Sequence, residues 1–90
     1  MTIREILNKL FWNSRWRKED YEIVFIHRGA YKNRKSISCR LIKAIQPSWF
    51  IYIDENGEET AIPFHRILEI RHVKTGESIW RTRRKHPSTQ

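Results

Sequence analysis

Two histidine-arginine dipeptides, His27-Arg28 and His65-Arg66, are the residues of this 90-residue chain best suited to bind an anion. A guanidinium donates two parallel hydrogen bonds to a phosphate, and an imidazole donates a further one or stacks on a base. The first pair ends an apolar run before Gly29, and the second pair follows another apolar run. If both strand ends lie on one rim, they surround a single anion-sized site, a convergence that the sequence leaves open.

The second dipeptide also has a purely structural interpretation. Neighbouring side chains of a strand point to opposite faces, so we expect only one of His65 and Arg66 to face the core side. Pro63 has no N–H to donate, which predicts that this end of the strand lies at a sheet edge or a bulge. One of the two side chains then caps backbone carbonyls there, and both interpretations stay open at this stage.

Two tryptophans beside arginines predict a surface on which RNA bases stack. Trp16 precedes Arg17, and Trp80 precedes Arg81. Aromatic rings interleaved with arginines are typical of single-stranded RNA recognition, because bases stack on the rings while the cations hold phosphates. Residues 81–85 form a dense cationic run, whose simpler role is solvated or nonspecific contact with a polyanion.

The charge of the chain points to a polyanionic partner. Lys and Arg number 18 against 10 Asp and Glu, which gives a net charge of +8. Nucleic acid, an acidic protein and an anionic membrane surface are the partner classes that such a charge favours. No stretch approaches the length of a membrane span, and no secretory signal is present, so we expect no membrane association.

The single cysteine, Cys39, excludes an internal disulfide and lacks the companions of a structural zinc site. Nearly half of the acidic residues fall in one turn, 54–59, where they make a poor metal site. No glycine-rich nucleotide-binding loop is present. We therefore expect no metal, no cofactor and a cytoplasmic location.

The pattern of the chain predicts an α+β fold. Residues 2–11 show the spacing of an amphipathic helix, with Thr2 as N-cap and Glu5 completing a capping box. Trp12 follows the apolar stripe and is expected in the core. Residues 21–29 are apolar on both faces, which predicts a central strand.

Further strands are expected at 36–46, 49–53, 60–64, 66–73 and 78–84. Asn56-Gly57 is the strongest hairpin signal in the chain, and Trp49 is expected in the core or on a sheet surface. The N-terminal helix therefore precedes five or six antiparallel strands, which form a twisted sheet or a small barrel. We expect one RNA-binding domain, 1–83, and a mobile basic tail, 84–90.

Four blocks of the sequence resemble a small, mostly archaeal family known as the RNA cyclic-group-end recognition domain. They are "TIREILNKLFW", "IHRG", "IPFHRILEIR" and "TGESIW", in this order. The resemblance covers nearly the whole chain, and residues 31–46 match least. It implies recognition of RNA ends that bear a 2′,3′-cyclic phosphate, and partners among RNA-repair or RNA-processing proteins.

The resemblance points to Arg28, His65, Arg66 and Trp80 as the polar signature, with Arg81 or Arg83 beside it. Together with the residues singled out above, the candidate RNA-binding set is Trp16, Arg17, His27, Arg28, His65, Arg66, Trp80, Arg81 and Arg83. The leading hypothesis is a noncatalytic module that binds single-stranded RNA or its terminal phosphate, and no residue is assigned a catalytic role.

Two other functions remain open. His27 and His65 are suited to general acid and base work on RNA, as in a metal-independent phosphodiesterase or nuclease. Against this, the paired His-x-Ser/Thr motifs of two-histidine phosphoesterases are missing from the sequence. The alternative is an architectural, ribosome-associated ribonucleoprotein component. Which RNA is bound, and whether the chain oligomerises, is not indicated by the sequence.

Overall fold

A computed structural model describes residues 2–13 and 16–82. The described residues form one α-helix, seven strands and four short 3-10 turns. The helix and strands are α1 (Ile3–Trp12), β1 (Tyr21–Ile26), β2 (Arg34–Ser38), β3 (Ile42–Ile45), β4 (Trp49–Ile53), β5 (Glu59–Pro63), β6 (Ile67–His72) and β7 (Ser78–Arg81). The 3-10 turns are η1 (Lys18–Asp20), η2 (Tyr31–Asn33), η3 (Cys39–Leu41) and η4 (Phe64–Arg66).

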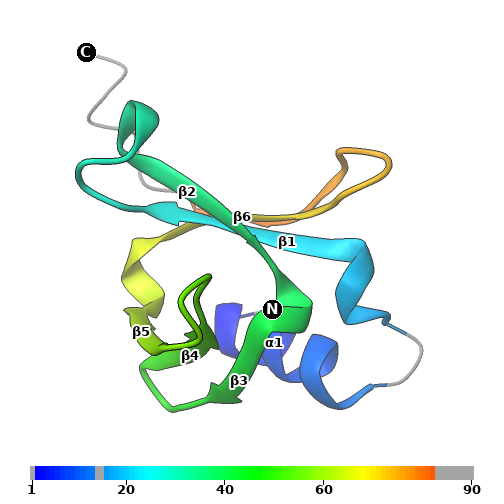
Figure 1. Cartoon of the computed structure of the whole chain (residues 1–90). Coiled ribbons are helices and arrows are strands. Elements are labelled where there is room, and N and C mark those ends of the chain that lie inside the picture. Colours follow the sequence, from blue (N-terminus) through cyan, green and yellow to red (C-terminus); the bar gives the residue numbers. More distant parts are fainter. Residues whose placement is uncertain (1, 14–15, 83–90) are drawn as a thin grey trace.

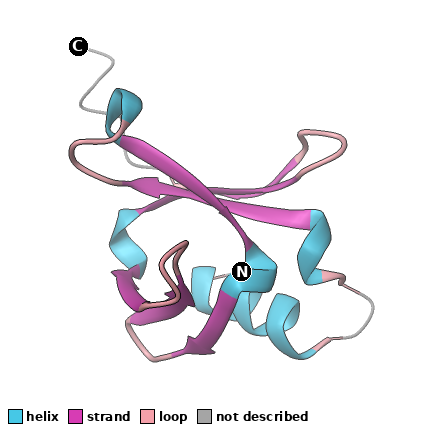
Figure 2. Ribbon diagram, in the orientation of Figure 1, coloured by secondary structure: helices cyan, strands magenta, loops and turns pink. Residues whose placement is uncertain are grey.

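The strands form two antiparallel sheets, which Figure 1 shows one above the other with α1 beside the lower one. The four-stranded sheet has the order β2-β1-β6-β7, and the three-stranded sheet has the order β3-β4-β5. The chain passes from the first sheet to the second through η3 and returns through η4, so these two turns, drawn in cyan like the other helices in Figure 2, are the corners between the sheets. The α+β class and the central position of β1 are confirmed.

Three predictions about the strands are wrong. The described residues contain seven strands instead of five or six, and the two sheets do not close into a barrel. The stretch 36–46, predicted as one strand, is divided by η3 into β2 and β3 of different sheets. The Ser38 hydroxyl accepts a hydrogen bond from the Arg40 N–H at 3.3 Å, a local turn that competes with extended backbone.

Helix α1 begins where the sequence predicted. The Thr2 N–H donates to the Glu5 carboxylate at 2.7 Å, and the Glu5 N–H donates to the Thr2 hydroxyl at 3.2 Å. This reciprocal capping box satisfies helix N–H groups that have no partner inside the helix, and these hydrogen bonds lower the pKa of Glu5. The expected apolar stripe is buried, with Ile6, Leu7 and Leu10 at 4% exposure or less.

Trp12 is not in the core, as was expected, but is 77% exposed at the end of α1. Successive residues of an α-helix are rotated by about 100°, so Trp12 lies about 200° around the helix from Leu10. Its ring contacts Phe11 edge to face, with the ring centroids 5.0 Å apart. The apolar stripe therefore ends before Trp12 instead of including it.

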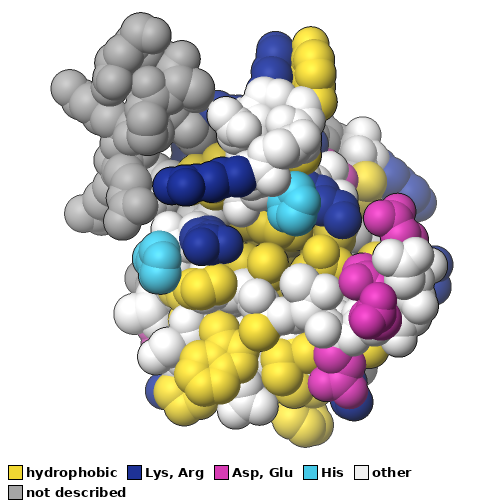
Figure 3. All heavy atoms as spheres, turned by 60° about the vertical axis from the view of Figure 1, so that its left-hand side comes forward, with side chains coloured by type: hydrophobic (Ala, Val, Ile, Leu, Met, Phe, Trp, Pro, Cys, Tyr) yellow, Lys and Arg dark blue, Asp and Glu magenta, His cyan; other side chains and the backbone are white. Residues whose placement is uncertain are grey.

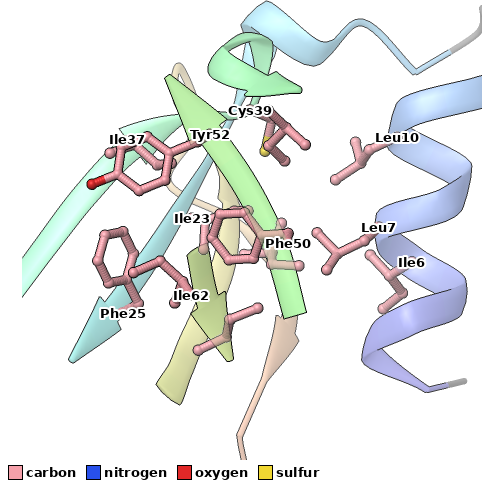
Figure 4. Close-up of a cluster of buried hydrophobic side chains, with 13 residues drawn as sticks. Ile6, Leu7, Leu10, Ile23, Phe25, Ile37, Cys39, Phe50, Tyr52 and Ile62 are labelled. Carbon is pink, nitrogen blue, oxygen red and sulfur yellow. The ribbon is translucent and has the colours of Figure 1, made fainter. Parts of the chain in front are cut away.

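One hydrophobic core joins the helix and both sheets (Figure 4). Phe25 of β1 and Phe50 of β4 are fully buried, and their ring centroids lie 6.4 Å apart across the two sheets. Cys39 of η3 is also fully buried, and burial raises the pKa of its thiol to about 12. The thiolate is the reactive form, so this cysteine is a packing residue.

The predicted hairpin at Asn56-Gly57 is confirmed as the turn between β4 and β5. Gly57 has φ +78°, a conformation that residues with a Cβ rarely adopt. The Asp54 carboxylate accepts hydrogen bonds from the N–H groups of Glu58 and Asn56, both at 2.9 Å, and the Glu58 bond above all lowers its pKa. No described helix is long and apolar enough to cross a membrane.

Candidate anion-binding site

The two histidine-arginine dipeptides meet at one hollow in the surface, with a volume of about 430 Å³. Its described lining is Ile26, His27, Arg28, His65 and Arg66, and we call this set the cationic hollow. The volume falls in the range of sites for small ligands, about 300–1,000 Å³. Figure 3 shows histidine and cationic side chains together on this face, while the acidic side chains in view gather elsewhere.

The first dipeptide is held by a tight turn at the end of β1. The Ala30 N–H donates to the His27 carbonyl at 3.2 Å, which places Arg28 and Gly29 at the corner. Gly29 has φ +92°, the positive value that a type II turn requires at its third residue. The His27 N–H donates to the Asn33 carbonyl at 2.9 Å, and its ring packs edge-on near Phe25. Arg28 is therefore displayed outward from a well-anchored turn.

The second dipeptide is not in a strand, and this corrects the prediction that His65 and Arg66 point to opposite faces. Both belong to η4, and both are exposed. A 3-10 helix has three residues per turn, so Phe64 and Ile67 lie on the same side. Phe64 packs against the core, and Ile67 is 1% exposed. The side chains of His65 and Arg66, which lie between these two residues, therefore both point toward solvent.

Pro63 explains why the strand ends there. It is the last residue of β5, an edge strand of the three-stranded sheet, as its missing N–H predicted. The following Phe64 N–H donates to the Ser48 carbonyl at 2.9 Å, which fixes the start of the turn. This corner brings the second dipeptide beside the first, although 37 residues separate His27 from His65 in the chain.

The cationic hollow carries unmatched positive charge. None of its described lining residues is acidic. Among the described residues, no carboxylate forms an ion pair with Arg28 or Arg66. Two guanidiniums with free donors, set beside two imidazoles, form an arrangement that favours a phosphate or a similar anion.

The two tryptophans predicted to stack on bases lie elsewhere. Trp16 packs against the core and stacks on Tyr21, with ring centroids 5.8 Å apart and planes at 21°. Trp80 of β7 is half-buried, pairs with Ile70 of β6 and packs against the same core. Neither belongs to the described lining of the hollow.

The three other predicted arginines also lie apart from the hollow or outside the described residues. Arg17 forms an ion pair with Glu19 at 3.0 Å, and this hydrogen bond raises the pKa of Arg17. Arg81 forms an ion pair with Glu69 at 3.4 Å. Arg83 falls in the stretch that the structure does not describe. Their roles in RNA binding remain predictions.

Sequence reasoning missed one residue of the hollow, Ile26, which is half-buried and adds an apolar surface beside the cations. Its signal was present in the sequence, because it directly precedes the first dipeptide in an apolar run. Within 2–13 and 16–82, no group of three or more His, Cys, Asp or Glu is placed to hold a metal ion.

Comparison with known proteins identifies relatives of this sequence. The family model described as the MJ1316 RNA cyclic group end recognition domain matches residues 1–82. The UPF0248 protein MJ1316 of Methanocaldococcus jannaschii is 46% identical over 79 residues, which cover 88% of this chain and 91% of that protein. No solved structure matches the chain.

Two more archaeal proteins extend the comparison. A UPF0248 protein of Methanococcus vannielii is 43% identical over 79 residues, covering 88% of this chain and 89% of that protein. The UPF0248 protein PYRAB10580 of Pyrococcus abyssi is 37% identical over 83 residues, covering 92% of each. Because the family model and these relatives span nearly all of the sequence, the chain belongs to the MJ1316 RNA cyclic group end recognition domain family.

Proposed function

We propose that this chain binds RNA ends that carry a phosphate, and that the 2′,3′-cyclic phosphate is its preferred end. The observation that carries the proposal is the convergence of the two histidine-arginine dipeptides on the cationic hollow. The net charge of +8 supports an RNA ligand, and the description of the family supports the cyclic end.

The chemistry of the hollow suits a terminal phosphate. Each guanidinium can donate two hydrogen bonds to two oxygens of one phosphate, and Arg28 and Arg66 approach from different elements. His27 and His65 supply further donors. The apolar side chain of Ile26 contacts the carbons of the ribose ring, which a cyclic phosphate holds rigid.

Charge alone predicts a different order of affinities from the one proposed. A linear phosphate carries nearly two negative charges near neutral pH, whereas a cyclic phosphate carries one. Purely electrostatic binding therefore favours the linear end. A preference for the cyclic end therefore requires that shape and hydrogen-bond geometry, instead of charge, determine the relative affinities. The planar guanidinium groups of the two arginines supply that geometry.

The test is a fluorescence anisotropy titration with three RNAs of one sequence that end in a 3′-hydroxyl, a linear 3′-phosphate or a 2′,3′-cyclic phosphate. We expect the cyclic end to bind at least about tenfold more tightly than the hydroxyl end, about 1.4 kcal/mol, and more tightly than the linear phosphate. This preference should persist as salt is raised. Equal affinity for all three, falling steeply with salt, would overturn the proposal in favour of an architectural role.

Two variants make the test specific. Arg66→Ala removes a cation from the hollow, and Arg4→Ala removes an exposed cation from α1, away from the described lining. Both changes alter the net charge equally. We expect Arg66→Ala to abolish the preference for the cyclic end and Arg4→Ala to retain it.

A second function is favoured by one observation, namely that His27 and His65 line the same hollow. One imidazole can take a proton from water while the other protonates the ribose oxygen that leaves the phosphorus, which opens the cyclic phosphate. Mass spectra of the RNA after incubation distinguish this enzyme from a binding module. A gain of one water that is lost in His65→Ala supports catalysis, and an unchanged mass excludes it for this RNA.

A further inference from the structure

Trp49 is an exposed tryptophan that neither the core nor the cationic hollow uses. It is 41% exposed at the start of β4, whereas Phe50 and Tyr52 of the same strand are at 2% or less. Side chains alternate along a strand, so Trp49 points to the solvent face of the three-stranded sheet. Its indole ring is therefore accessible to a ligand, and the residues beside it decide whether a ligand binds there.

Trp49 stands directly beside the turn that supplies His65 and Arg66. It pairs with Pro63 of β5, and the preceding Ser48 carbonyl accepts the hydrogen bond from the Phe64 N–H. Paired strand residues have Cα atoms about 5 Å apart, and two residues extend at most about 7 Å. The Cα atoms of Trp49 and His65 are therefore at most roughly 12 Å apart, a separation that the two side chains and one nucleotide can bridge.

The residues beside Trp49 on this face of the three-stranded sheet are apolar. Ile51 and Pro63 are half-buried, and Ala61, opposite Ile51, is exposed. Figure 3 shows hydrophobic side chains directly below the histidine and cationic side chains of this face. An RNA whose terminal phosphate occupies the hollow therefore has an aromatic ring within reach of its next group, the base of the same nucleotide.

We propose that Trp49 is the base-stacking subsite of the anion site, so that the ligand is an unpaired terminal nucleotide. This inference rests on the function proposed above and adds the class of RNA end. A base stacks on an indole face whatever its identity, because every base has a π-face, so no strong sequence preference follows. A terminal base held in a duplex is already stacked and paired, and a blunt duplex end therefore binds more weakly than a single-stranded one.

The experiment compares two RNAs with the same 2′,3′-cyclic phosphate, one at the end of a single-stranded overhang and one at a blunt duplex end. We expect the wild type to bind the overhang about tenfold more tightly than the blunt end. Trp49→Ala should bind the overhang and the blunt end with equal affinity, and Trp49→Phe, which keeps a smaller ring, should retain part of the preference for the overhang. Trp12→Ala is the matched control, because it removes an equally large exposed ring from α1, and it should leave the ratio unchanged.

A second measurement does not depend on the folding of the alanine variant. A 2-aminopurine at the terminal position loses fluorescence when it stacks, and the same base in the middle of the RNA is the control. We expect the wild type to quench the terminal probe, Trp49→Phe to quench it less and Trp12→Ala to quench it fully. Equal quenching by wild type and Trp49→Phe, with an unchanged overhang ratio, overturns the assignment of Trp49.

The outcomes separate the two proposals. If the wild type shows no preference for the cyclic end over the hydroxyl end, the proposed function is rejected, and the assignment of Trp49 as the base-stacking subsite is rejected with it. If that preference is present but overhang and blunt ends bind equally in the wild type, only the role of Trp49 is overturned. The thermal midpoint of each variant checks that a lost ratio does not reflect unfolding.

Discussion

Arginines occur both at the cationic hollow and on the face of the four-stranded sheet away from the core, but within the described part of the chain only the second group has carboxylate partners. We call the arginines of this sheet face, together with the side chains that they contact, the sheet network. Its members are Glu22, Glu69, Arg71, Ser78 and Arg81. Arg71 forms an ion pair with Glu22 and lies 3.8 Å from Glu69, while Arg28 and Arg66 have no such partner among the described residues.

The presence or absence of a carboxylate partner indicates which arginines are available to a ligand. Glu69 of β6 links three strands. Its carboxylate accepts hydrogen bonds from Ser78 and Arg81 of β7, and its backbone pairs with Val24 of β1. The same carboxylate lies near Arg71 of its own strand. A guanidinium with a carboxylate already beside it has part of its charge neutralised and fewer N–H groups left for a phosphate. An unpaired guanidinium keeps its full charge and its N–H groups for the ligand. Each region has two arginines, but those of the hollow are more available to a phosphate.

The largest expected effect is on RNA affinity, from loss of both arginines of the hollow. We expect Arg28→Ala combined with Arg66→Ala to lower affinity for a cyclic-phosphate end at least about a hundredfold, or about 2.7 kcal/mol. The thermal midpoint should stay the same, because neither side chain makes an ion pair within the described residues. Anisotropy and differential scanning calorimetry measure the two quantities. A lower thermal midpoint with little loss of RNA affinity would mean that Arg28 and Arg66 stabilise the fold instead of binding the ligand.

The next effect is on stability, from the sheet network. We expect Arg71→Ala to lower the free energy of unfolding by about 1 kcal/mol, a modest value because Arg71 is 37% exposed and water screens its ion pairs. Affinity for RNA should change less than about twofold. Urea denaturation gives the stability, with Arg71→Lys as the variant that keeps the charge. A large loss of RNA affinity in Arg71→Ala would place the sheet network in the ligand site.

A smaller effect concerns the dependence of affinity on salt. We expect Arg28→Ala to reduce the slope of log affinity against log salt by about 0.7, the value for one contact to a single-stranded phosphate. Arg81→Ala should leave the slope unchanged, because Glu69 already neutralises that guanidinium. Titrations at four salt concentrations measure both slopes. An equal reduction by the two variants would instead support the prediction from sequence that Arg81 contacts RNA.

The smallest effect is on acid stability, through Glu69. Partial burial tends to raise the pKa of Glu69, but the hydrogen bonds from Ser78 and Arg81, with the nearby charges, lower it overall. A carboxyl whose pKa is lower in the folded state stabilises the fold above its ordinary value of 4.5, and this stabilisation is lost as pH falls through the lowered pKa. We expect Glu69→Gln to flatten the acid limb of a stability profile followed by circular dichroism. A wild-type stability that rises on acidification would contradict this sign.

Local patterns in the sequence predicted much of the fold. The capping box at Thr2 and Glu5, the central strand β1 and the turn at Gly57 all depend on residues close together in the chain. The prediction failed where a short turn competed with extended backbone. Both η3 and η4 lie inside or beside apolar runs, and the period of a strand gives no sign of a single 3-10 turn.

The candidate site was predicted in part. The residues of both dipeptides were identified by type, but the sequence indicated opposite faces for His65 and Arg66 and left their approach to His27 open. The exposure of the tryptophans was predicted least well, since Trp12 is exposed instead of buried. Exposure depends on what the rest of the chain places over a residue, which neighbours in sequence do not indicate.

The amino-acid sequence on its own determined the positive charge, the helix and its cap, the hairpins and the two histidine-arginine pairs. Those features follow from composition and from interactions over a few residues. Only the folded chain determined that the two pairs meet, because η4 returns the chain from one sheet to the other. It also determined which of the described arginines have a carboxylate partner, since the pairing of β1 with β6 brings Glu22 to Arg71 from 49 residues away.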